Sequence, residues 1–253
     1  MTVQVLLAII LFLLMVLIGG KKGARSFFTL FLNFGVLFIT IIIMTVPNVN
    51  PVILTLIAST AISCINLFYI NGVNSKTKTA FLSSMITIVI LLFFIVFITN
   101  KAMIQGFGEE EIEELSVFSL YIGVDFVKIA AAVIIMSAIA SIVDIAISIA
   151  SPMQEVFHHH PSISRKELYN FGLSIGRDVL GTDTNTLFFA FFGSYLGLLI
   201  WFKDLSYSLG EVINSKVFSA EMINILCAGI GVALIIPVTA WTTAHVLVKT
   251  REK

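Results

Sequence analysis

Residues 129–151 read IAAAVIIMSAIASIVDIAISIAS, an apolar run interrupted by serines and by a single charged residue, Asp144. A run of about 20 mostly apolar residues is long enough for a helix to cross the ~30 Å hydrocarbon core of a bilayer. A charged side chain at the centre of such a helix costs about 2.5–3.5 kcal/mol on insertion scales. This stretch therefore predicts a transmembrane helix in which Asp144 has a functional role.

The composition of the whole chain indicates the same class of protein. Hydrophobic residues make up 58% of the 253 residues, charged residues only 12%, and the mean hydropathy is +1.04. Soluble domains are about 25% charged, so we expect an all-α polytopic membrane protein. The formal net charge is zero and gives no indication of nucleic-acid binding. Cys64 and Cys227 lie in apolar runs and lack the spacing of a metal site or a disulfide framework.

Further apolar segments on both sides complete the predicted architecture. Seven segments are long enough to cross a membrane, near 2–19, 26–46, 52–70, 80–99, 124–150, 176–202 and 223–247. The longest loops are too short to form a soluble domain. We therefore expect one membrane domain over 1–253, in which 1–118 holds the first four helices and an acidic outer loop and 119–253 holds helices five to seven.

The distribution of Lys and Arg predicts the orientation, because cytoplasmic loops carry an excess of both residues. One set of loops is cationic, with Lys21, Lys22, Arg25, Lys76, Lys78, Arg165, Lys166, Lys249, Arg251 and Lys253. The opposite set has Lys101, Lys203 and Lys216 and the acidic run EEEIEE at 109–114. We expect the N-terminus outside and the C-terminus in the cytoplasm. The first segment lacks a cationic start and a cleavage site, so it is expected to be a retained helix.

A polar stripe runs along the segment that contains Asp144. Its members are Ser137, Ser141, Asp144, Ser148 and Ser151, and steps of four, three, four and three place them on one helix face. Serines at this spacing are also typical of a helix–helix seam, since small residues let helices approach closely. An intramembrane aspartate, by contrast, needs a partner, a proton or water.

A second polar stretch, GRDVLGTDTNT at 176–186, lies on the next predicted helix. Because consecutive helices are antiparallel, Arg177 and Asp178 fall at a depth similar to that of Asp144. Two interpretations stay open. In the first, Arg177 forms an ion pair with Asp144. In the second, Arg177 pairs with another group or extends to the interface, and Asp144 stays protonated and exchanges protons near neutral pH.

The same helix has a polar face that continues toward the midplane, with Ser174, Asp178, Thr182 and Asn185 at steps of four, four and three. Four consecutive polar residues at 183–186, close to a glycine, indicate a locally wet or discontinuous helix that lines a substrate or ion path. A polar packing core is the alternative. The candidate path residues are Ser148, Gly181, Thr182, Asn185 and Thr186.

These two stretches resemble the YibE/F family of bacterial membrane proteins. The segments SIVDIAISIASPMQEV (141–156) and PSISRKELYNFGLSIGRDVLGTDTNTLFFAFFGSYL (161–196) follow the family's D-x-(A/S)-I-S-I-(A/S)-S pattern, its E-(L/I) helix and its G-x-x-I-G-R-D-(I/V)-(M/L)-G-T-x-x-N-T-L pattern. Asp183 departs from the pattern, where the family has an apolar residue or Met. The matching positions are Asp144, Glu155, Ser164, Gly172, Gly176, Arg177, Asp178, Gly181, Thr182, Asn185 and Thr186.

The resemblance implies a multi-pass protein of the bacterial inner membrane, with the lipid bilayer as its surroundings. It also implies a partner, a larger paralogous YibE/F subunit with an extracellular region. It does not imply any particular chemical activity. The order of an acidic helix, a short cytoplasmic segment and a Gly–Thr-rich helix is similar, as an analogy alone, to SecF and the resistance-nodulation-division permeases. In those proteins an intramembrane Asp couples proton flow to work.

The loop between the two motif helices contains the tract His158, His159 and His160. Three consecutive residues of a helix cannot all face one ion, and zinc sites use separated ligands. We expect a solvated tract, with metal binding or pH sensing as the weaker alternative and no cofactor. The sequence has no phosphate-binding glycine loop, Ser–His–Asp set or H-E-x-x-H motif, so we expect no enzymatic activity.

Three functional hypotheses follow. The first is a permease, or the membrane subunit of a two-component transporter, that is proton-coupled through Asp144 with Arg177 and Asp178 tuning its charge. The second is a non-transporting structural or regulatory subunit. The least favoured is an intramembrane enzyme, because the Y-D and G-x-G-D patterns of intramembrane aspartyl proteases are absent.

Overall fold

The computed structural model describes residues 2–46, 48–104, 106 and 125–251, and in these residues it contains helices and no strand. The expected acidic outer loop at 109–114 lies outside the described residues. The helices are α1 (Val3–Met44), α2 (Pro51–Cys64), the π-helical turn η1 (Ile65–Tyr69), α3 (Ser75–Ala102), α5 (Phe126–His159), α6 (Arg165–Ser194), α7 (Leu196–Asp204), α8 (Leu209–Asn214) and α9 (Lys216–Arg251).

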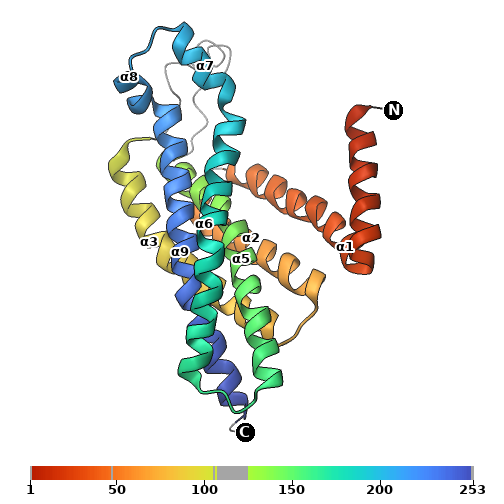
Figure 1. Ribbon diagram of the computed structural model, residues 1–253. Helices are drawn as coiled ribbons and strands as arrows, with labels where there is room; N and C mark the ends of the chain where they lie inside the picture. Colours follow the sequence, from red (N-terminus) through yellow and green to blue (C-terminus); the bar gives the residue numbers. More distant parts are fainter. Residues whose placement is uncertain (1, 47, 105, 107–124, 252–253) are drawn as a thin grey trace.

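α1 is a hairpin of two helical arms. The chain reverses at Gly20, whose φ of 54° and ψ of −134° are not helical, and glycine adopts positive φ without steric cost. The arms touch near the turn, since a Cβ on Gly23 would lie 1.7 Å from the Met15 carbonyl oxygen. Farther from the turn, the Phe12 and Phe27 rings pack with centroids 4.9 Å apart. Figure 1 shows the two arms beside the rest of the molecule. They correspond to the first two predicted segments.

The long apolar helices agree with a multi-pass membrane protein. Five helices are individually long and apolar enough to cross a bilayer, and α6 with α7, bent by 51°, adds a sixth when the pair counts as one span. Each of the seven predicted segments overlaps a helix, because α1 contains two of them. The number of crossings and the orientation stay predictions.

α5 lies at the centre of the helix packing and contacts α2, α3, α6 and α9. α3 and α9 also pack on each other, and α6 lies along α9 (Figure 1). Small residues allow the close approach of α6 and α9: a Cβ on Gly176 would lie 2.1 Å from Ile236 Cγ2. A buried hydrogen bond of 3.0 Å, donated by the Thr239 hydroxyl to Ser83 Oγ, joins α9 to α3.

α5 extends farther than the sequence predicts. It continues through Pro152 to His159, whereas the predicted segment ends near residue 150. The side chain of Met153 is fully buried, and a Cβ on Gly172 of α6 would lie 2.6 Å from its sulfur. This tertiary contact explains why the polar sequence after Pro152 stays helical, although proline removes one backbone hydrogen bond.

Candidate functional site

Contacts between helices give the depth of Asp144. Ile142, two residues before it, packs on Gly231 of α9, where a Cβ would lie 3.1 Å from Ile142 Cδ1. Gly231 follows Glu221 by ten residues and precedes Lys249 by eighteen, which corresponds to about 15 Å and about 27 Å of helix. Asp144 therefore lies well inside the apolar layer.

Asp144 on α5 and Asp183 on α6 are carboxyl groups on two helices that contact each other. The Asp144 side chain is exposed on the isolated chain, yet the surrounding helices desolvate it in part, and it experiences the negative charge of Asp183 on α6. Asp183 itself is half-buried. Among the described residues, the ion pairs within 4.0 Å are Asp125–Lys128 and Glu155–His159. Arg177 therefore does not pair with Asp144 in this structure.

The serine stripe of α5 is accessible in its middle and contacts other helices at its ends. Ser137, Asp144 and Ser148 are exposed, and Ser141 and Ser151 are half-buried. The side of α5 that packs in the core is apolar, with Ile142, Ile145, Ala146 and Ile149 among its members. The two ends of the stripe, Ser137 and Ser151, bond to side chains of α9 and α3.

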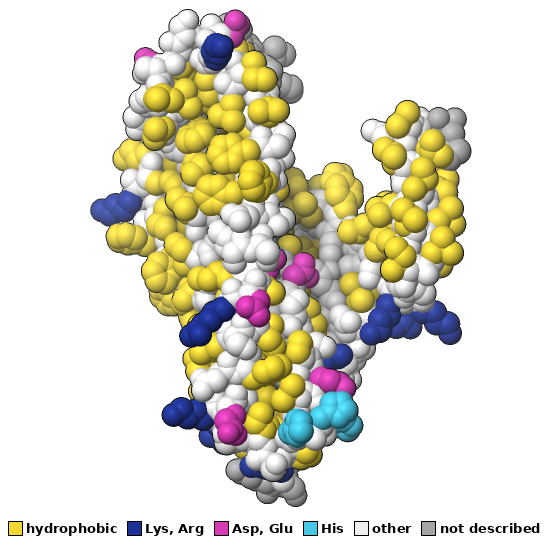
Figure 2. Space-filling view, viewed as in Figure 1, with side chains coloured by type: hydrophobic (Ala, Val, Ile, Leu, Met, Phe, Trp, Pro, Cys, Tyr) yellow, Lys and Arg dark blue, Asp and Glu magenta, His cyan; other side chains and the backbone are white. Residues whose placement is uncertain are grey.

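α6 presents a longer polar surface on the side opposite α9. Glycines 172 and 176 are buried against α9 and α5, and the hydroxyls of Thr182 and Thr186 donate to backbone carbonyls of α6 itself. Figure 2 shows Asp or Glu and Lys or Arg side chains part of the way along this side of the molecule, between hydrophobic zones. The exposed residues are Ser174, Arg177, Asp178, Gly181, Thr182, Asn185 and Thr186.

The polar run does not break the helix. Residues 183–186 are helical, and α6 is continuous from Arg165 to Ser194. The bend comes later, between Ser194 and Leu196. The expectation of a discontinuous helix at the midplane is therefore wrong for α6. Thr182 and Thr186 are accommodated within the helix, where their hydroxyls donate to the backbone carbonyls of Val179 and Thr182.

A polar cluster that the sequence did not predict lies where α5, α6 and α9 meet. The Tyr195 hydroxyl donates to Glu221 Oε1 at 2.9 Å, and the side-chain amide of Asn224 donates to Glu221 Oε2 at 3.3 Å. The Ser137 hydroxyl donates to Asn224 Oδ1. These residues line a cavity of about 220 Å³ between α5, α6 and α9. Only Ser137 carried a signal in the sequence, as the first member of the stripe.

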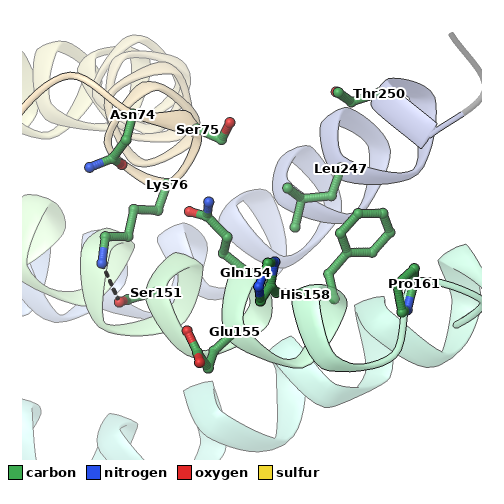
Figure 3. A pocket seen from close by; sticks show the side chains of 11 residues that line it. Asn74, Ser75, Lys76, Ser151, Gln154, Glu155, His158, Pro161, Leu247 and Thr250 are labelled. Carbon is green, nitrogen blue, oxygen red and sulfur yellow. Dashed lines mark hydrogen bonds between the residues drawn. The ribbon is translucent and has the colours of Figure 1, made fainter.

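A second cavity, of about 470 Å³, lies at the opposite end of α5, near α3 and α9. Figure 3 shows Lys76 of α3 reaching Ser151 of α5, and the ammonium group donates to Ser151 Oγ at 3.2 Å. Gln154, Glu155 and His158 also line this cavity.

The histidine tract lies at the C-terminal end of α5, next to Glu155. His159 contacts Glu155 at 3.1 Å on the helix surface, and the His158 ring lies beside the His159 ring. Within the described residues, no three His, Cys, Asp or Glu side chains are grouped to hold a metal ion. Glu155 thus acts as a partner of the tract.

The fold and the site together define an α-helical, multi-pass membrane protein with carboxyl groups inside its apolar layer. The family model described as YibE/F-like protein matches residues 7–249, nearly the whole chain. The chain belongs to the YibE/F family, and the resemblance inferred from the two motif helices is confirmed. No curated protein and no solved structure matches the chain.

Proposed function

We propose that this chain is the membrane subunit of a proton-coupled transporter in the bacterial inner membrane. The placement of two carboxyl groups, Asp144 on α5 and Asp183 on α6, on helices that contact each other carries the proposal. Two ionised carboxylates near each other repel, and charge inside the membrane is costly. A proton held by the pair relieves both costs, and its uptake and release change the charge between the two helices.

In the proposal, protons reach the pair from two cavities along α5. The cavity with Glu221 includes Ser137, before Asp144, and the cavity near Lys76 includes Ser151, after it. Ser137 and Ser148 flank Asp144 on its own face of α5. In the proposal they help to conduct protons toward Asp144, while Arg177 and Asp178 tune the charge nearby and Thr182, Asn185 and Thr186 form part of the polar path.

Proton flux into liposomes tests the proposal. Wild-type protein and the Asp144→Asn variant are compared under an imposed pH gradient and membrane potential. Asp204→Asn, at the exposed end of α7, is the matched control because it removes a carboxylate outside the site. Flux in the wild type and in the control that disappears in a correctly assembled Asp144→Asn protein supports the proposal. Equal flux in all three proteins contradicts it.

The second candidate function is a structural or regulatory subunit of a membrane complex, in which the resemblance implies a larger paralogue as partner. The exposed polar face of α6 favours it, because such a face is suited to contact another membrane protein. A subunit of this kind keeps its partner and shows no flux of its own. We propose no catalytic activity for the chain.

A further inference from the structure

Two opposite charges stand side by side on the outward face of α6. Arg177 and Asp178 are both exposed, and α6 packs on α9 through the other side of the helix. In the described part of the chain, neither side chain takes part in an ion pair or a side-chain hydrogen bond. This cation and this anion are therefore available to groups outside the chain.

Their depth makes lipid an unfavourable neighbour. Gly176, adjacent to Arg177, packs on Ile236 of α9. Ile236 follows Glu221 by fifteen residues and precedes Lys249 by thirteen, or about 22 Å and about 20 Å of helix. Arg177 and Asp178 thus lie near the middle of the apolar part of α9. Each charge exposed to lipid at that depth costs about 2.5–3.5 kcal/mol or more.

Gly181 lies at the centre of the same face. It is four residues after Arg177 and three after Asp178, and this spacing places it between them, one turn farther along the helix. A Cβ at Gly181 would meet nothing within 4 Å, whereas a Cβ at Gly172 or Gly176 would collide with neighbouring side chains. Packing inside the chain thus accounts for the other two glycines and leaves Gly181 free for a close approach from outside.

We infer that two copies of this chain associate through this face of α6, with Arg177 of each copy paired to Asp178 of the other. Copies inserted in one orientation carry the same residue at the same depth, so a twofold axis along the membrane normal brings the faces together. An adjacent cation and anion on each copy then form two reciprocal ion pairs. Gly181 lets the backbones approach, as small residues do at transmembrane helix contacts.

The association goes beyond the proposed transport function and does not depend on it. It would also enclose the polar path, since Thr182 and Asn185 share the face with Asp178. We infer a second copy of this chain as the partner because its Asp178 and Arg177 complement Arg177 and Asp178 of the first copy.

Disulfide cross-linking in membranes tests the contact. The background replaces Cys64 and Cys227, the cysteines of the chain, with alanine, and single cysteines are introduced as Ser174→Cys and Asn185→Cys on the face. Phe93→Cys is the matched control, because Phe93 is 75% exposed within α3. We expect a cross-linked dimer of this chain for both α6 positions and none for the control. Cross-links only to a different protein, or equal cross-linking at all three positions, overturn the inference.

Charge reversal tests the ion pairs. In the Asn185→Cys background, Arg177→Asp gives each copy two acidic residues at positions 177 and 178. Asp178→Arg gives each copy two basic residues at these positions. Each variant alone should form at least about tenfold less cross-linked dimer than the Asn185→Cys protein, because like charges then face each other in the membrane. Co-expression of the two variants should restore cross-linking, now between unlike copies. Restoration also shows that both variants fold. Unchanged cross-linking in the single variants, or no restoration in the mixture, contradicts the reciprocal pairing.

Discussion

Asp144 of α5 and Asp183 of α6 place two carboxyl groups on helices that pack against each other in the bundle. Both residues lie on long helices whose packing against α9 is set by glycines, which makes their relative position a property of the fold. Ser137, which precedes Asp144 on the same face of α5, lines the cavity that contains Glu221. The placement of the two carboxyl groups makes Asp183 as important to the account as Asp144.

The packing of α6 on α9 predicts a difference between two glycine substitutions. Gly176→Ala should lower the free energy of unfolding by about 1–3 kcal/mol, the usual cost of overpacking, because the new Cβ would lie 2.1 Å from Ile236 Cγ2. Gly181→Ala should leave the fold unchanged, since no atom lies within 4 Å of its Cβ position. Thermal unfolding in detergent measures both, and Ile236→Ala should partly rescue Gly176→Ala. Equal effects of the two glycine variants would show that α6 packs differently.

The hydrogen bond between Thr239 and Ser83 predicts a measurable coupling between α9 and α3. Side-chain hydrogen bonds inside membrane proteins contribute about 0.6 kcal/mol on average and at most about 1.7. A double-mutant cycle with Thr239→Val and Ser83→Ala should therefore give a coupling energy of about 0.6 kcal/mol in detergent unfolding. The cycle of Thr239→Val with Ser63→Ala is the control, because Ser63 donates within its own helix, α2. Additive effects at Thr239 and Ser83 would argue against the bond.

The distribution of Lys and Arg predicts which end of the molecule faces the cytoplasm. In the cysteine-free background, Ser75→Cys lies at the cavity near Lys76 and Asn214→Cys lies at the end of α8. A membrane-impermeant thiol reagent added to intact cells should label Asn214→Cys and should label Ser75→Cys only after permeabilisation. The reverse pattern would invert the predicted orientation.

Asp125 predicts a dependence of stability on acid pH at the start of α5. Its hydrogen bond with Lys128, together with backbone N–H groups that it caps, lowers the pKa of Asp125 below its ordinary value. Because the folded protein binds this proton less tightly than the unfolded chain, the stabilisation is present above about pH 3.9 and is lost as the pH falls through the lower folded pKa. Asp125→Ala should flatten the acid side of a plot of unfolding temperature against pH and remove a cap of about 1 kcal/mol. A curve parallel to that of the wild type would disprove this role.

Hydrophobic pattern predicted the helical segments well, because crossing a bilayer demands long apolar runs. It did not predict the full length of α5, since the polar residues after Pro152 resemble a loop until Met153 is seen buried beside Gly172. It also missed the cluster of Tyr195, Glu221 and Asn224, whose members come from different helices and meet only through packing.

The sequence left open whether Arg177 pairs with Asp144, and it gave no sign that Asp183 lies on the side of α6 toward α5. Arg177 and Asp183 are six residues apart on α6, which corresponds to about 240° around the helix, so they point in different directions. The rotation of α6 about its axis decides which of them faces α5. That rotation is set by Gly172 and Gly176 against their neighbours, a tertiary contact that a single sequence does not reveal.

The most direct test of the central claim is proton flux in a double-mutant cycle of Asp144→Asn and Asp183→Asn, measured in liposomes under the same pH gradient and membrane potential. Groups that hold one proton together act as a unit, so their effects are not additive. The account predicts that either single variant loses the flux of the wild type and that the double variant loses no more. Wild-type flux in a correctly folded Asp183→Asn protein, together with its loss in Asp144→Asn, would contradict the claim that the two carboxyl groups work as a pair.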